Sequence, residues 1–289
     1  MIEAPFSGVC TALVTPFLGE SINYPMVEVL LRRQIDAGVQ SVVLAGTTGE
    51  SPALSDSEKL ELFRRAKAYV GNDCKIIAGT GSNNTAHTIR LSKLAQDVGV
   101  DGLLVVSPYY NKGTVESLEK HYRSISQSVS IPIIVYNVPS RTGQDLPVDL
   151  YKRLAMLSNI VGVKEASSDM TKITKIRCSC GSRLAIWSGN DDLTVPVVSL
   201  GGQGVISVTS NIVPEEVVRM TKAALDGDFD TAAELQIRLQ ALNELMFCEV
   251  NPIPVKAAMR YIGYDCGSCR LPLGDASTET IKKLSSYFR

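Results

Sequence analysis

The stretch Gly162-Val163-Lys164-Glu165-Ala166 places a lysine at the end of a short apolar strand that begins near Ile160. Side chains alternate between the two faces of a strand. If Val161 and Val163 pack against outer helices, Lys164 points into the enclosed side of the sheet and Glu165 points away from it. A lysine deprived of water has a lowered pKa, which makes its amine a nucleophile near neutral pH. The competing interpretation is a strand-end lysine whose amine extends to solvent.

Seven further apolar segments of similar length lie along the chain, so the strand that carries Lys164 is one of eight. They are rich in Val and Ile and apolar on both faces, as strands buried on both sides of a parallel sheet must be. The predicted strands are Gly8–Val14, Ser41–Leu44, Lys75–Ala78, Gly102–Val106, Ile131–Tyr136, Ile160–Lys164, Leu184–Trp187 and Gly204–Val208.

Helical patterns separate these strands, and one of them opens with a capping box formed by Ser55 and Glu58. Eight strands, each followed by a helix, predict an α/β protein with a (β/α)8 TIM barrel over residues 1–225. After the eighth strand the alternation stops, so residues 226–289 are predicted to form a C-terminal helical extension. A doubly wound open sheet is the alternative, but no Gly-x-Gly-x-x-Gly follows an early strand, so a dinucleotide-binding version has little support. The predicted helices are Asn23–Ala37, Ser55–Val70, Thr85–Val98, Thr114–Val129, Leu146–Leu157, Met170–Cys180, Asp191–Leu200, Pro214–Leu225, Thr231–Met246, Pro254–Tyr261 and Ser277–Tyr287.

The composition argues against several classes of protein. Of the 289 residues, 45% are hydrophobic, and 29 basic and 30 acidic residues give a net charge of −1. Such a balance predicts no binding to nucleic acid or to a membrane surface. The N-terminal residues Met1–Pro5 lack a basic segment followed by an apolar one, and no apolar run is long enough to span a bilayer. We therefore expect a cytoplasmic protein without a signal peptide.

Cysteine and histidine are too sparse to suggest a metal site. Seven cysteines, an odd number in a large chain, indicate reduced thiols rather than a disulfide framework. The pairs within Cys178–Cys180 and Cys266–Cys269 could hold zinc only if the fold brought them together, and incidental thiols are the preferred interpretation. With only His87 and His121, a Ser-His-Asp triad or a multi-histidine metal site is nearly excluded.

Polar and glycine-rich residues gather where the predicted strands end, which is where a barrel carries its active site. The second strand is followed by Gly46–Ser51, whose glycines permit a tight turn and whose amides and hydroxyls suit a carboxylate or phosphate. The fifth ends in Tyr136–Gly143, where Tyr136 can relay a proton and Arg141 can hold a carboxylate. Taken singly, each is equally an ordinary turn, a packed tyrosine or a surface arginine. Together they favour a catalytic Lys164.

Three motifs are jointly very specific: Gly46–Ser51 (GTTGES), Tyr136–Gly143 (YNVPSRTG) and Gly162–Ala166 (GVKEA). In them the chain resembles the dihydrodipicolinate synthase / N-acetylneuraminate lyase family of class I, pyruvate-dependent aldolases. The resemblance extends from about Gly8 to Leu273. It implies a barrel lyase that acts through a covalent pyruvate imine and needs no metal or organic cofactor. Within the family it favours the branch that joins pyruvate to L-aspartate 4-semialdehyde, a step of diaminopimelate and lysine biosynthesis.

The resemblance also implies the catalytic residues. Lys164 would form the Schiff base with the keto carbon of pyruvate, and Tyr136 would donate and accept protons. Thr47 would link Tyr136 to Tyr110, which in the family reaches across from a neighbouring subunit. This arrangement requires at least a dimer, and the resemblance implies a homotetramer built as a dimer of dimers.

Four further residues are implied to bind the substrates. Thr48 would hold the carboxylate of pyruvate, and Ile206 would offer a backbone carbonyl near it. Gly189 would line the same pocket. Arg141 would bind the carboxylate of aspartate semialdehyde, and the related sialic-acid lyases usually lack an arginine at this position.

Two alternatives remain open at this point. One is another pyruvate-dependent aldolase of the family, an N-acetylneuraminate or 2-keto-3-deoxy sugar acid lyase, because few contacts set substrate choice. The other is a non-catalytic barrel that binds a keto acid, since a fold does not dictate a function.

Regulation by lysine is a separate expectation. Many members of the family are inhibited by lysine, and Ser51, Asn83 and Tyr109 match that pattern. Lys59 and His87 stand where lysine-sensitive members have a histidine and a glutamate. Because like charges repel, we expect weak or absent inhibition.

Overall fold

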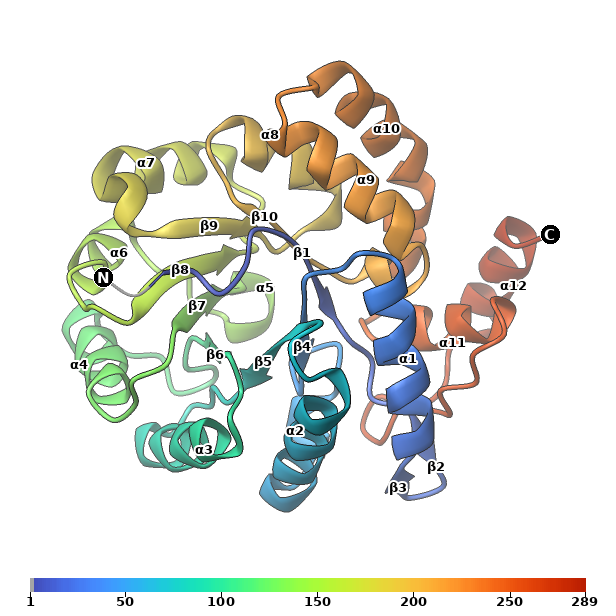
Figure 1. The fold of residues 1–289 in the computed structure, drawn as a ribbon, viewed down its shortest axis with the longest axis horizontal. Helices are drawn as coiled ribbons and strands as arrows, with labels where there is room; N and C mark the ends of the chain where they lie inside the picture. The colour runs from blue at the N-terminus through green and yellow to red at the C-terminus, as the bar shows by residue number, and fades with distance from the viewer. Residues whose placement is uncertain (1–2) are drawn as a thin grey trace.

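Eight parallel strands close into a barrel in the order β1-β10-β9-β8-β7-β6-β5-β4 (Figure 1). The computed structural model describes residues 3–289, so Met1 and Ile2 of the N-terminal segment considered above lie outside the described residues. The predicted (β/α)8 TIM barrel is confirmed, and the alternative of an open sheet is wrong. The barrel strands are β1 (Gly8–Ala12), β4 (Ser41–Leu44), β5 (Lys75–Gly79), β6 (Gly102–Val106), β7 (Ile133–Asn137), β8 (Ile160–Glu165), β9 (Ala185–Ser188) and β10 (Gly204–Ser207).

Helices surround the barrel, and every predicted helical segment contains one (Figure 1). The capping box at the start of α2 is also confirmed, since Ser55 and Glu58 bond each other's backbone amides. The helices are α1 (Tyr24–Asp36), α2 (Asp56–Val70), α3 (Thr85–Val98), α4 (Val115–Ser126), α5 (Pro139–Thr142), α6 (Val148–Leu154), α7 (Met170–Cys180), α8 (Thr194–Ser199), α9 (Pro214–Leu225), α10 (Phe229–Met246), α11 (Ile253–Tyr261) and α12 (Thr278–Tyr287).

Three details differ from the prediction. A small hairpin of β2 (Phe17–Leu18) and β3 (Ser21–Ile22) and the short helix α5 were not expected from the pattern. The segment predicted as the helix Asp191–Leu200 divides into a 3-10 turn, Asp191–Leu193, and α8. Pro196 explains the break, because a proline is tolerated only in the first turn of an α-helix, so α8 begins just before it.

The structure corrects one side-chain placement in β8. Val163 packs outward against the helices as expected, but Val161 lies with the residues that fill the barrel interior. Residues 133 and 134 of β7 pair with residues 160 and 162 of β8, so Val161 is an extra residue in the strand. Such a bulge interrupts the alternation of faces. Counting back from Lys164 therefore assigns Val161 to the wrong face of the strand.

The two ends of the barrel differ. Near the start of the strands, Phe6 stacks on Trp187 with 4.7 Å between ring centroids, and both side chains are buried in the interior cluster. The polar side chains lie at the opposite end. Beyond the barrel, α10 packs on α9, and α11 and α12 lie on the side where the chain ends (Figure 1). Within residues 3–289, no helix is both long and apolar enough to cross a membrane.

Candidate active site

A cavity of about 550 Å³ opens at the ends of the barrel strands. Six of the eight predicted site residues line it, although they come from separate segments of the sequence. Two of them lie on the strands β7 and β8, and the other four lie in the segments that follow β4, β7 and β9. These residues are Thr47, Thr48, Tyr136, Arg141, Lys164 and Gly189.

Lys164 and Tyr136 form the centre of the cavity. They are register partners on the neighbouring strands β8 and β7, so both side chains point to the interior face. The Nζ atom of Lys164 lies 4.4 Å from the centroid of the Tyr136 ring. Lys164 is 5% exposed and Tyr136 6% exposed. The lysine therefore does not extend to solvent, and the interpretation of a solvated strand-end lysine is wrong.

Glu165 faces the other side of the sheet, as the alternation of β8 predicts. Its carboxylate accepts hydrogen bonds from the Asn137 amide and the Tyr151 hydroxyl, both at 2.8 Å. Burial, followed by the charge of Glu165, raises the pKa of Tyr151, so this phenol stays protonated as a donor. The nearest ion-pair contact of Glu165 is with Lys172, at 3.9 Å, and not with Lys164. This outer network supports β7 and β8 without occupying the amine of Lys164.

The turn after β4 supplies the hydroxyls. Thr47 and Thr48 both line the cavity, and the side chain of Thr48 is buried. The hydroxyl of Thr48 accepts a hydrogen bond of 3.0 Å from the side-chain amide of Asn251, and the carbonyl of Asn251 accepts one of 2.9 Å from Arg141. Asn251 thus joins two of the three motifs. Sequence reasoning missed it, because it lies 203 residues from Thr48 and carries no local signal beyond the following proline.

Position 189 has room only for a glycine. A Cβ built on it would lie 2.6 Å from the Cβ of Ala166, closer than any side chain tolerates. Only glycine lets the loop after β9 approach the loop after β8, and the cavity keeps its width there.

The remaining two predicted residues do not line this cavity within one chain. Ile206 is fully buried in the barrel interior on β10. Tyr110 is 92% exposed and adopts a left-handed backbone conformation, with φ of +69°. It does not line the cavity of its own chain.

Two buried carboxylates beside the site were also missed. Asp191 accepts hydrogen bonds from the Ser207 hydroxyl and from the Val208 amide, and burial raises its pKa. These hydrogen bonds and, to a smaller extent, the charge of Lys164 oppose this rise in the pKa. Glu50, at the end of the turn that carries Thr47, pairs with Lys256 of α11 at 2.8 Å. No local sequence pattern predicts that these two carboxylates are buried. For Glu50, the partner Lys256 lies far along the chain, in the helical extension.

The cysteines form no metal centre in the described part of the chain. No group of three or more His, Cys, Asp or Glu residues there is arranged to hold a metal ion. All seven cysteines are free. Burial raises the pKa of Cys266 and of Cys269 to about 12, which keeps both as neutral thiols.

Comparison with known proteins agrees with this geometry. A model of the Dihydrodipicolinate synthetase family matches residues 5–289. A 4-hydroxy-tetrahydrodipicolinate synthase of Thermoanaerobacter sp. (strain X514) is 43% identical over 282 residues, which cover 97% of this chain and 95% of that protein.

Two solved structures have the same fold over nearly their whole length. The dihydrodipicolinate synthase from Aquifex aeolicus is 41% identical with a TM-score of 0.96, and the match covers 98% of this chain and 97% of that one. A monomeric dihydrodipicolinate synthase variant is 40% identical with a TM-score of 0.95, and the match covers 98% and 95% of the two chains.

Proposed function

Because the chain belongs to the dihydrodipicolinate synthetase family, we propose that it condenses pyruvate with L-aspartate 4-semialdehyde to form 4-hydroxy-tetrahydrodipicolinate. The expected resemblance and the enzyme class, a lyase of the class I aldolase type, are confirmed by the relatives. The observation that carries the proposed chemistry is the buried amine of Lys164 against the Tyr136 ring, inside a cavity lined by the Thr47 turn.

In the proposed first half-reaction, the amine of Lys164 attacks the keto carbon of pyruvate, and the resulting carbinolamine takes up one proton through Tyr136 and loses water, which yields a protonated imine. This imine draws electrons, so the methyl carbon loses a proton and an enamine forms. Tyr136 is the neighbouring group that can carry these protons. Thr48 and the amides of its turn would hold the pyruvate carboxylate, with the Ile206 carbonyl nearby.

In the second half-reaction, the enamine carbon attacks the aldehyde carbon of the semialdehyde, a carbon–carbon bond forms, the protonated imine is restored, and the aldehyde oxygen takes up a proton to become a hydroxyl. Arg141, at the rim of the cavity, would hold the carboxylate of this substrate through paired hydrogen bonds. The amine of the bound product then displaces Lys164 from the imine carbon. This closes the ring and restores the free lysine. Every step uses groups of the chain or its substrates, so the proposal requires no added cofactor.

We extend the proposal to the assembly. The exposed Tyr110 would enter the cavity of a neighbouring subunit and connect through Thr47 to Tyr136. The proposed assembly is a homotetramer, a dimer of dimers, in the cytoplasm. Residues 226–289 would act as an extension of the barrel formed by residues 1–225, since Asn251 and Lys256 both contact the Thr47–Glu50 turn.

Steady-state turnover tests this function. Purified protein is supplied with pyruvate and L-aspartate 4-semialdehyde and, separately, with N-acetylneuraminate and a 2-keto-3-deoxy sugar acid. We expect turnover only with the first pair. Preferred cleavage of either sugar acid would replace the proposal with that lyase activity, and binding of pyruvate without turnover of any substrate would indicate a non-catalytic barrel.

A further inference from the structure

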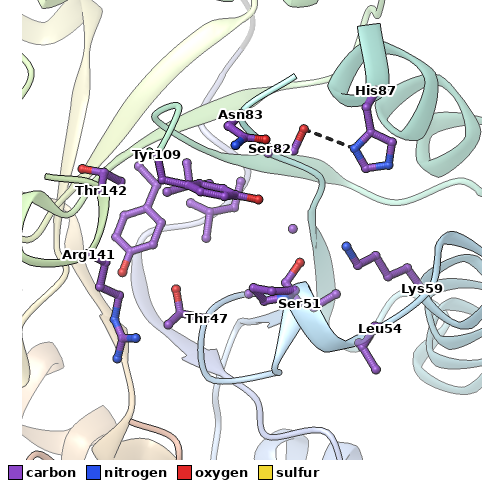
Figure 2. Close-up of a pocket in the computed structure, with 18 of the residues that line it drawn as sticks. Thr47, Ser51, Leu54, Lys59, Ser82, Asn83, His87, Tyr109, Arg141 and Thr142 are labelled. Atoms are coloured by element: carbon purple, nitrogen blue, oxygen red, sulfur yellow. Dashed lines mark hydrogen bonds between the residues drawn. The ribbon is translucent and has the colours of Figure 1, made fainter. Parts of the chain in front are cut away.

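The loop after β6, residues 107–114, presents two consecutive tyrosines in different ways. Tyr109 lines a second cavity of about 550 Å³ within its own chain, together with Asn83 and Thr142 (Figure 2). Tyr110 lines neither this cavity nor the catalytic one, and it is 92% exposed. A large aromatic side chain in water gains none of the free energy that burial provides. The conformation of the loop, and not the packing of the side chain, therefore determines where Tyr110 lies.

The backbone at Tyr110 is strained. The Asn111 amide donates a hydrogen bond to the Tyr109 carbonyl at 2.9 Å, which closes a three-residue turn around Tyr110. With φ of +69°, this turn is of the rare kind that is unfavourable for a residue with a side chain. Such a conformation persists only where the surrounding structure holds it. The contacts that hold the loop after β6 therefore also orient Tyr110.

Two side chains hold the loop just after Tyr110. The side-chain amide of Asn111 donates to the Asn83 carbonyl at 2.9 Å. The side-chain amide of Gln144 donates to the Gly113 carbonyl at 2.6 Å, and its oxygen accepts a hydrogen bond of 3.3 Å from the Gly113 amide. Both hydrogen-bonding groups of Gln144 are thus used on a single residue of the loop, which fixes that residue in position and in orientation.

Gln144 belongs to the segment that also carries Arg141. The Thr142 hydroxyl donates to the Gln144 carbonyl at 2.9 Å and accepts a hydrogen bond of 3.3 Å from the Gln144 amide, so the main chain is fixed there. The side chain of Lys112 lies against Gly143, since a Cβ built on this glycine would be 3.0 Å from Cε of Lys112. The loop after β6 and the segment that carries Arg141 are therefore held together by two separate contacts.

We propose that Gln144 is a positioning residue for the active site of a neighbouring copy of the chain. By holding Gly113, it keeps Tyr110 in one orientation, so that the tyrosine enters the cavity of that copy without first having to order its own loop. The inference rests on the proposed function, in which Tyr110 acts across the subunit boundary. It adds that the segment that binds the semialdehyde in one subunit also sets the proton relay of the next.

Steady-state kinetics of Gln144→Met test the proposal, because methionine keeps the length of the side chain but loses both hydrogen bonds to Gly113. We expect kcat to fall about tenfold, since the loop then samples other conformations, while the KM for pyruvate changes by less than about twofold. Tyr110→Phe should lower kcat at least as much, and Gln144→Met should cause no further loss in the Tyr110→Phe background. Gln127→Met, at an exposed glutamine directly after α4, is the matched control and should leave kcat unchanged. Urea unfolding checks that each variant is folded.

Three outcomes would overturn the proposal while the proposed function stands. The first is an unchanged kcat in Gln144→Met. The second is a full additional loss of kcat when Gln144→Met is added to Tyr110→Phe, because Gln144 would then act independently of the tyrosine. The third is a higher KM for the semialdehyde with an unchanged kcat, because Gln144 would then serve only Arg141 of its own chain. A fully active Tyr110→Phe variant would instead remove the relay across the subunit boundary and the positioning role with it, and an inactive wild type would remove the proposed reaction.

Discussion

Replacement of Lys256 by methionine tests how the helical extension supports the turn that carries Thr47. Lys256 of α11 pairs with Glu50 at 2.8 Å, and the two side chains are only 2% and 0% exposed. Lys256 also donates to the Ser268 carbonyl at 3.0 Å, and the second oxygen of Glu50 accepts from the Arg270 amide. Glu50 itself adopts a left-handed backbone, with φ of +57°. An L-residue in this conformation needs such fixed partners.

The cost follows from this geometry. At 2.8 Å, the attraction between the two charges is about 6 kcal/mol with an effective dielectric constant of about 20. Methionine keeps most of the side-chain volume and its apolar contacts, so the loss of stability is smaller than the full attraction between the two charges. Removing one partner of a buried pair leaves an uncompensated charge and costs about 3–5 kcal/mol. We therefore expect Lys256→Met to lower the free energy of unfolding by that amount and to reduce kcat, because the turn that carries Thr47 loses its anchor.

Urea unfolding followed by circular dichroism measures the change. The double variant Glu50→Gln/Lys256→Met should lose only about 1–2 kcal/mol, since no buried charge remains. Lys282→Met, at an exposed lysine of α12, should stay within about 0.5 kcal/mol of wild type. The reasoning is refuted if Lys256→Met is as stable as this control, or if the double variant is as unstable as the single one.

Three further predictions follow from the same structure. Lys59→Met should raise the unfolding free energy by about 1–3 kcal/mol, because it removes a buried cation that pairs with no acceptor among residues 3–289, and an unchanged or lower urea midpoint would contradict this. Burial lowers the pKa of His121 from 6.5 to about 4. As the pH falls below 6.5, the unfolded chain therefore binds a proton at this histidine before the folded chain does. The stability contributed by neutral His121 should then decrease by up to about 3 kcal/mol as the pH falls towards 4, and His121→Gln should show a shallower pH dependence in urea titrations. Arg141→Gln should raise the KM for L-aspartate 4-semialdehyde about tenfold or more with little change in the KM for pyruvate, and an equal rise in both would remove the assigned role of the arginine.

The barrel was predictable because its signal is repeated. Eight apolar segments and the helical patterns between them each support the same topology, so an error in the boundary of one segment does not change the predicted fold. The inward direction of Lys164 followed from the alternation of a single strand, whereas a catalytic role was favoured only once the polar residues at the ends of the other strands were considered. The same rule failed at Val161, because a bulge depends on the pairing with β7 and leaves no mark in the local sequence.

The supports of the site could not be predicted for a related reason. Asn251 and Lys256 act on a turn about 200 residues earlier in the chain, and only the closed barrel brings them there. A polar residue in a helical extension reads as a surface residue until its burial is known. Lys59 is similar, since the pattern of α2 does not reveal that Asp56 is occupied by His87 and Arg90.

Borohydride reduction in the presence of pyruvate tests the central claim most directly. If Lys164 is the Schiff-base nucleophile, reduction traps pyruvate as a stable secondary amine, and mass spectrometry of the digested chain locates it on the peptide that contains Lys164. Lys164→Arg, treated in parallel, should remain unmodified. An adduct on Lys59, Lys172 or Lys256 instead, or the absence of any adduct in a folded and active preparation, would contradict the account.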